Sequence, residues 1–122
     1  MTFWKEQFVS KFITQDKCWL LNLTIRYVKA DKLTALSYAK VDSVAFVFYY
    51  RLPKTAEADE YLHMINQVLS TRAIQLDGSF YLPYRLHYTK EQLETCYPNF
   101  KKWLAGLPKS RIFSNMWLVK YE

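Results

Sequence analysis

The sequence predicts one α+β domain, with a small antiparallel sheet and helices packed on one face. The chain has 122 residues, which is room for a single domain of ordinary size. Hydrophobic residues make up 51% and aromatic residues 18% of it, and such a composition excludes a disordered chain. The hydrophobic period alternates between helical and strand spacing, in the order helix, strand, strand, helix, strand, helix. Two adjacent strands followed by alternating elements suit this fold class.

The first part of the chain predicts one helix and two strands. Residues 3–14 place their apolar side chains near one side of a helix. Within 19–29, apolar residues alternate with polar ones, which is typical of a strand with one polar face. Residues 43–51 (SVAFVFYYR) are β-branched and aromatic on both faces, so they predict a central strand that Pro53 closes.

The middle of the chain predicts a long helix and a third strand. Thr55 is the expected N-cap of the helix, because acidic residues follow it in the first turn. Apolar residues then recur at helical spacing up to Leu76, and Gly78 stands where a C′ glycine is expected. Residues 79–86 (SFYLPYRL) predict a short strand, in which Pro83 indicates an edge position or a bulge.

The last part of the chain predicts two short helices and a packed tail. Thr89 and Gln92 have the spacing of a capping box, so a helix is expected from there to about Cys96. Pro98 begins a further helix that runs through Leu104 and ends at a glycine. Residues 110–121 are apolar and aromatic, so we expect them to pack onto the rest of the domain.

Charge and cysteine usage predict a cytoplasmic protein without a membrane segment. The net charge is +6, but the basic residues are scattered, which is typical of a solvated surface. Binding of single-stranded nucleic acid by stacked Tyr and Phe rings is an alternative, opposed by the expectation that these rings form the core. Cys18 and Cys96 are expected to be reduced thiols, with a single disulfide as the alternative. The N-terminal residues show no secretory signal, and no stretch is apolar enough to span a bilayer.

The residues that usually carry catalysis are sparse. The chain has 2 histidines, His63 and His87, which are far apart in sequence and do not indicate a metal site. Its 2 glycines cannot build a phosphate-binding glycine loop or a nucleophile elbow. The sequence therefore does not predict an enzyme that acts on its own.

Polar residues on the predicted strands indicate a binding surface. Thr24 and Arg26 share one face of the first strand, and Tyr49 lies on the second. Tyr84 and Arg85 belong to the predicted third strand. If the strands form one sheet, the two guanidinium groups and a phenol converge on one concave face, where they would hold an anion or stabilise developing negative charge. The alternative is that the two arginines pair with acidic residues at the surface.

A distributed pattern of residues resembles a known family. It comprises NLTIRYVKADKLTALSYAKVDSVAFVFYY (22–50), EADEYLHMINQVL (57–69), GSFYLPYRLHYTKEQLETCYPNFKKWLA (78–105) and FSNMW (113–117). It resembles the C-terminal substrate domain of FAD-linked oxidases in the vanillyl-alcohol oxidase superfamily, on the side that includes aldonolactone and alditol oxidases. The resemblance implies an antiparallel sheet backed by helices that covers a flavin held by a separate domain.

The resemblance also implies roles for particular residues. Arg26 matches the arginine of an E-x-R strand motif, whose acid is replaced by Thr24. Val47 and Tyr49 lie where relatives carry polar residues that face the substrate. Arg85 takes the position of the lysine in an H-W-x-K pattern near the flavin. Arg26 and Arg85 are thereby expected to be catalytic, and Thr24, Tyr49 and Tyr84 to bind substrate.

The end of the chain and the missing flavin domain complete this interpretation. Asn115 matches a frequent asparagine of the family's terminal segment and is the expected cofactor-binding residue, whereas the family's K-x-x-Y/F-D-P run is absent. Residues 1–122 are one substrate-domain-like unit without an FAD-binding domain. FAD is thus expected only if a separate domain or subunit supplies it, and a homo-oligomer or a non-catalytic interaction module is the alternative.

Overall fold

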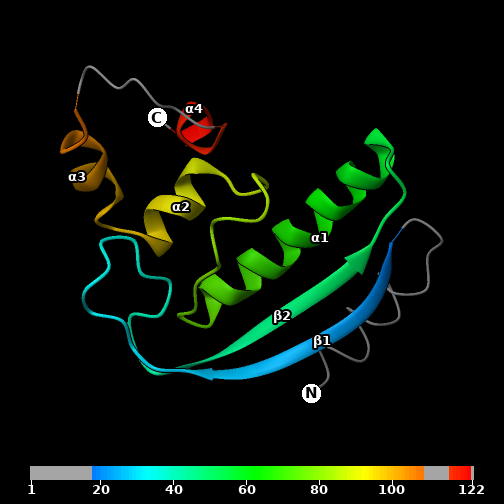
Figure 1. Ribbon diagram of the computed structural model, residues 1–122, viewed down its shortest axis with the longest axis horizontal. Helices are drawn as coiled ribbons and strands as arrows, with labels where there is room; N and C mark the ends of the chain where they lie inside the picture. The colour runs from blue at the N-terminus through cyan, green and yellow to red at the C-terminus, as the bar shows by residue number, and fades with distance from the viewer. Residues whose placement is uncertain (1–17, 109–115, 122) are drawn as a thin grey trace.

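The computed structural model describes residues 18–108 and 116–121 as a small α+β fold. Its elements are β1 (Trp19–Val28), β2 (Ser43–Arg51), α1 (Ala56–Gln75), α2 (Lys90–Cys96), α3 (Phe100–Ala105) and α4 (Met116–Tyr121). The two strands form an antiparallel sheet, and the helices lie on one side of it (Figure 1). The predicted fold class is confirmed. The helix predicted at 3–14 lies outside the described residues.

The strands β1 and β2 pair in a register that separates an apolar face from a polar one. Leu23 is opposite Phe48 and Thr24 is opposite Val47, with a register shift between Leu20 and Asn22. Directly opposite residues share a face of the sheet, and successive residues alternate between the two faces. The face that carries Phe48 packs on α1, so the face that carries Thr24 is turned away from that helix.

The helix α1 is the longest element and begins where the sequence predicts. The side chain of Thr55 accepts a hydrogen bond from the backbone N–H of Ala58 at 3.2 Å, as expected of the N-cap. Glu57 and Asp59 occupy the first turn, near the positive end of the helix dipole. The 20 residues of α1 run back along β2 from one end of the sheet toward the other (Figure 1).

The C′ position of α1 is occupied one residue earlier than the sequence predicts, by Asp77 and not by glycine. Asp77 takes the left-handed conformation, with φ 56°, and Gly78 follows it. The N–H of Gly78 bonds the carbonyl of Ala73 at 2.8 Å and that of Asp77 bonds Ile74 at 3.0 Å, which is the Schellman pattern. A Cβ on Gly78 would lie 2.9 Å from the carbonyl oxygen of Ala73. Close approach, rather than a positive φ, is what requires glycine at this position.

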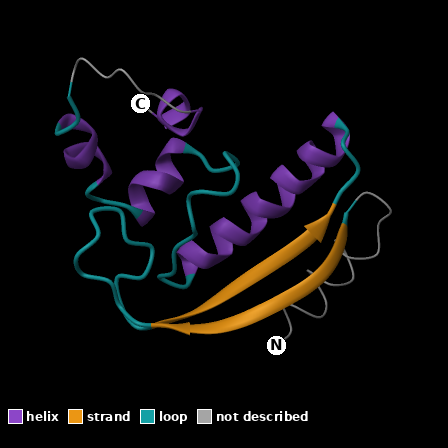
Figure 2. Cartoon of the chain, in the orientation of Figure 1, coloured by secondary structure: helices purple, strands orange, loops and turns teal. Residues whose placement is uncertain are grey.

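The third strand predicted at 79–86 is wrong. This segment is irregular and runs back between α1 and α2 rather than joining the sheet (Figure 2). Phe80 and Leu82 are buried while Tyr81 and Pro83 are exposed, so burial alternates along these residues as it would in a strand. Side chains, and not a neighbouring strand, bond carbonyl groups of this segment. The Tyr97 hydroxyl donates to the carbonyl of Phe80, and the Lys120 ammonium donates to the carbonyl of Leu86.

The later helices follow their sequence signals closely. Thr89 and Gln92 form a complete capping box at the start of α2, as predicted. The next helix, α3, begins at Phe100 rather than at Pro98 and ends at Gly106. In α4 the side chain of Tyr121 is buried, so this part of the apolar tail packs as expected.

The described residues form two separate hydrophobic cores. The larger core joins the 80–88 segment to the three short helices. Its buried members are Phe80, Leu82, Leu93, Cys96, Tyr97, Phe100 and Tyr121. The smaller core lies between α1 and the sheet, where Cys18, Leu62 and Ile65 pack against Phe48 and Tyr50. None of the described helices has the length and apolarity needed to cross a bilayer.

Candidate functional site

The structure brings three of the predicted site residues to one face of the sheet. Thr24 lies opposite Val47, and Arg26 lies two residues further along the same face, opposite Ala45. Tyr49 pairs with Asn22 and shares this face, and its side chain is 66% exposed. Arg26 is also exposed among the described residues. This polar row, Thr24, Arg26 and Tyr49, is turned away from α1.

The other predicted arginine lies elsewhere. The Arg85 guanidinium donates to the carboxylate of Asp59 on α1, with an N–O distance of 3.1 Å. Since α1 covers the opposite face of the sheet from Arg26, the two guanidinium groups do not converge on one concave face. The segment that carries Arg85 lies against α1 and is not part of the sheet. The alternative, in which Arg85 pairs with an acidic residue, is confirmed.

The two remaining predicted residues are separate from the polar row. Tyr84 is 77% exposed and contacts the ring of Tyr81, with 5.3 Å between the ring centroids. It therefore belongs to the α1 side, with Arg85. Asn115 lies outside the described residues.

The sequence reasoning missed a histidine cluster on α1. His63 and His87, which are both of the histidines in the chain, stack with 5.0 Å between ring centroids and an interplanar angle of 22°. His63 lies four residues after Asp59, so both point from the same side of α1. That spacing was visible in the sequence. The approach of His87 was not, because it depends on the path of the 80–88 segment across the helix.

His87 is held by polar groups on α1. Its Nδ1 lies 2.8 Å from the amide nitrogen of Asn66, and its carbonyl oxygen accepts a hydrogen bond from Gln67. Its Nε2 is 3.7 Å from a carboxylate oxygen of Asp59. An amide NH₂ donates to Nδ1 only when that nitrogen carries no proton, so this geometry fits a neutral imidazole protonated at Nε2.

Burial also favours the neutral form of this imidazole. The His87 side chain is buried, and burial lowers its pKa below the ordinary value of 6.5. The neighbouring His63 and Arg85 lower the pKa further, while Asp59 acts in the opposite direction. The cluster therefore contains one carboxylate, one guanidinium and two imidazoles, and a single negative charge faces up to three positive ones.

The cysteines and the metal-ligand groups give no second site. Cys18 and Cys96 are both buried free thiols, and burial raises the pKa of each, which keeps them in the unreactive protonated form. In the part of the chain that the structure describes, no group of three or more His, Cys, Asp or Glu side chains could hold a metal ion.

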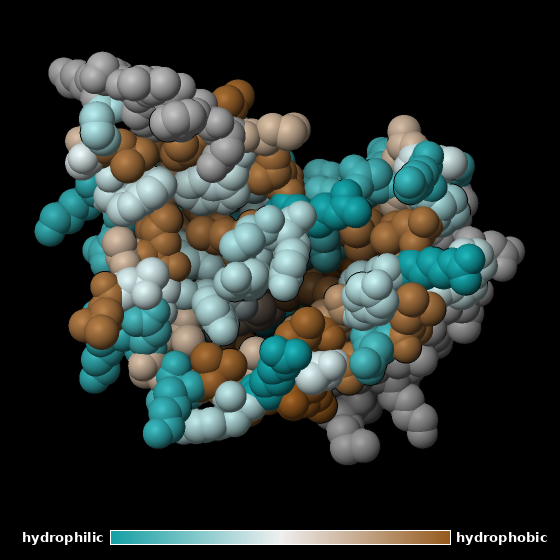
Figure 3. Space-filling model, viewed as in Figure 1, coloured by the Kyte–Doolittle hydropathy of each residue, from teal (hydrophilic) through white to brown (hydrophobic). Residues whose placement is uncertain are grey.

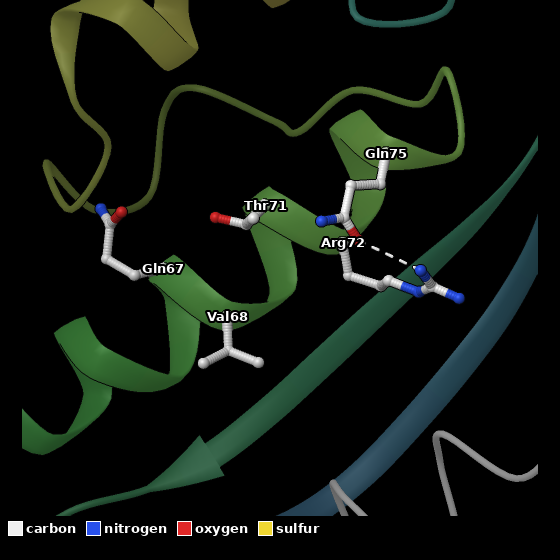
Figure 4. A pocket seen from close by; sticks show the side chains of 5 residues that line it. All are labelled: Gln67, Val68, Thr71, Arg72 and Gln75. Atoms are coloured by element: carbon white, nitrogen blue, oxygen red, sulfur yellow. Dashed lines mark hydrogen bonds between the residues drawn. The ribbon is translucent and has the colours of Figure 1, made fainter.

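A shallow groove follows one side of α1 next to the histidine cluster. Its lining consists of Gln67, Val68, Thr71, Arg72 and Gln75 (Figure 4). Val68 points toward the sheet, and Arg72 bonds Gln75 within the helix at 3.1 Å. The lining contains no general acid or base, so this groove by itself has no catalytic set.

The apolar face of the sheet extends beyond the part that α1 covers. Ile25 is opposite Phe46 and Tyr27 is opposite Val44, on the same face as Phe48. These four side chains are between 44% and 65% exposed. Hydrophobic side chains reach the surface over the strands in Figure 3. A monomeric domain seldom exposes such a row of aromatic and branched side chains without a function for it.

No family model, curated protein or solved structure matches this chain.

Proposed function

We propose that this chain is the substrate-binding portion of an FAD-dependent oxidoreductase that oxidises a hydroxyl-bearing substrate. The observation that carries the proposal is the polar row on the outer face of the sheet. Thr24, Arg26 and Tyr49 stand side by side there. They are also positions to which the resemblance to FAD-linked oxidases assigns substrate contacts. The chain does not hold the flavin itself and is not active alone.

The polar row would bind and orient the substrate. The flavin would accept a hydride from the carbon that bears the hydroxyl group. The Arg26 guanidinium would hold the substrate oxygen and stabilise negative charge that develops on it. The hydroxyl groups of Thr24 and Tyr49 would form hydrogen bonds to neighbouring substrate oxygens. We leave Arg85 and Tyr84 out of this site, because α1 lies between them and the row.

A flavin-binding domain or subunit is the proposed partner, in the cytoplasm. The exposed apolar side chains at Ile25, Tyr27 and Val44 support this proposal, because an obligate partner would bury such a surface. The same domain would have to reach the polar row around the edge of the sheet. The sheet is only two strands wide, so the path from one face to the other is short.

The test is a visible absorption spectrum of the chain purified under native conditions from its own source, with the co-purifying proteins identified. We expect a flavin band together with a flavin-binding partner in a fixed ratio to this chain. A colourless preparation that stays colourless after addition of FAD and contains no flavoprotein would overturn the proposal.

A non-catalytic interaction module is the second candidate, and the exposed apolar face favours it as well. If this face serves self-association, the elution volume in size-exclusion chromatography will shift with protein concentration. A flavin-free chain that remains monomeric at every concentration tested would remove self-association.

A further inference from the structure

We infer that a histidine latch holds the 80–88 segment on α1, and that acidification opens it. The latch consists of Asp59, His63 and Asn66 on α1, and Arg85 and His87 on the segment. This inference does not depend on the flavin proposal, since it concerns only groups within this chain.

The segment depends on side chains for its attachment. It forms no ladder with either of the two described strands. At its C-terminal end it is tied to α1 by Arg85 with Asp59, by Asn66 with the His87 ring, and by Gln67 with the His87 carbonyl. Among these three ties, the one from Asn66 depends on the protonation state of the His87 ring.

The groups around the His87 ring carry more positive than negative charge. Asp59 and His63 face it from α1, and Arg85 faces it from its own segment. On the neighbouring residues, α4 supplies the ammonium of Lys120 at the Leu86 carbonyl and the hydroxyl of Tyr121 at the Tyr88 carbonyl. Asp59 is the single carboxylate among these groups, and Arg85 already occupies one of its oxygens at 3.1 Å.

Uptake of a proton by the His87 ring would disturb this arrangement. A protonated His87 ring would carry a hydrogen on Nδ1 that points at the donor amide of Asn66, so that hydrogen bond must break or the amide must turn over. Protonation of the His87 ring would place a buried cation near the Arg85 guanidinium and against the His63 ring, whose centroid is 5.0 Å away. Like charges repel, and a buried charge also loses its hydration. Release of the segment separates the charges and returns His87 to water.

The chain offers an unusually clean background for the test. Its 2 histidines both belong to the latch, and histidine is the side chain that ordinarily titrates between about pH 5 and pH 8. The order parameters of the 84–88 backbone, obtained from NMR relaxation, would be followed across that range. We expect them to fall on acidification, because the released segment becomes mobile. The order parameters of α1 and of the sheet should remain high.

Three variants make the test specific. His87→Asn keeps an acceptor near the Nδ1 position but cannot take up a proton, so the pH dependence should disappear. His63→Gln changes only the exposed ring, and it should reduce the pH dependence. Asp59→Asn should loosen the segment at every pH, whereas Glu60→Gln, the same loss of charge at the next position of α1, should not. If His87→Asn does not fold, the other variants still decide the question.

Other results would overturn the inference. Constant order parameters for 84–88 from about pH 8 to about pH 5 would show that the histidines do not control the segment. A loss of order spread equally over α1 and β2 would indicate global unfolding rather than a latch. A pH dependence that persists unchanged in both His63→Gln and His87→Asn would assign it to another group.

Discussion

At the scale of single residues, His87 links the stability of the fold to pH. Its pKa in the folded chain lies below the ordinary value of 6.5, mainly because the ring is buried. Between the lowered pKa and 6.5, the folded chain binds fewer protons than the unfolded chain, so the free energy of unfolding rises with pH. The contribution is fully present above pH 6.5 and is lost as the pH falls below it.

Urea unfolding on either side of pH 6.5 measures this effect. We expect the free energy of unfolding to be lower on the acidic side, and the difference to shrink in His87→Asn. Equal values for the two proteins at both pH values would contradict the prediction.

Arg26 is the residue that most directly tests the proposed function. Arg26→Ala should lower kcat/KM of the complex with its flavin partner by about tenfold to a hundredfold, because hydrogen bonds to charged groups contribute about 1.5–3 kcal/mol. The unfolding midpoint should not change, since the side chain is exposed. Lys29→Ala, which removes an exposed cation just beyond the end of β1, is the matched control and should leave turnover unchanged. Unchanged turnover in Arg26→Ala would remove that residue from the site.

At the scale of the elements, the capping box of α2 has a predictable energetic value. Thr89→Ala removes the acceptor for the Gln92 N–H, which it bonds at 3.1 Å, and should destabilise the protein by about 1 kcal/mol. Thr95, which bonds the carbonyl of Glu91 within the same helix, offers the control. Thr95→Ala should be neutral, because alanine favours the helix. Equal losses for the two variants in chemical denaturation would contradict a capping role.

The end of α1 should respond to substitution in opposite directions at two adjacent positions. Asp77→Gly should stabilise the protein by up to about 1 kcal/mol, because the left-handed conformation strains a residue with a Cβ. Gly78→Ala should destabilise it by about 1–3 kcal/mol, because the new Cβ would meet the Ala73 carbonyl at 2.9 Å. Thermal melts of the two variants measure both shifts, and shifts in the same direction would contradict the assignment.

The elements that the sequence predicted correctly are those whose signals are local. Thr55 and Thr89 cap their helices through partners three residues away, so the pattern alone identifies both starts. The prediction of a strand at 79–86 was wrong because a strand requires a distant partner in the chain. The alternation of Phe80 and Leu82 shows only which side of the segment is buried.

The same limit applies to the candidate site. The spacing of Asp59 and His63 is local, but the approach of His87 depends on tertiary structure. The polar row was predictable because the two strands follow each other in the chain.

At the scale of the whole molecule, α1 connects two parts that are otherwise packed separately. Leu62 and Ile65 face the sheet and belong to the smaller core, while Ile74 near the end of the helix packs against the larger one. The latch acts at the side of α1 that faces away from the sheet. Opening of the 80–88 segment can therefore leave the contact between α1 and the sheet in place.

Each of the two cores encloses one cysteine, Cys18 in the smaller and Cys96 in the larger. A thiol reagent that reacts only with exposed sulfur therefore has one target in each. The two modification rates, resolved by mass spectrometry, report how often each core opens, with no engineered cysteine needed. Unequal rates would mean that the two cores open independently, and equal rates would mean that α1 makes them one cooperative unit.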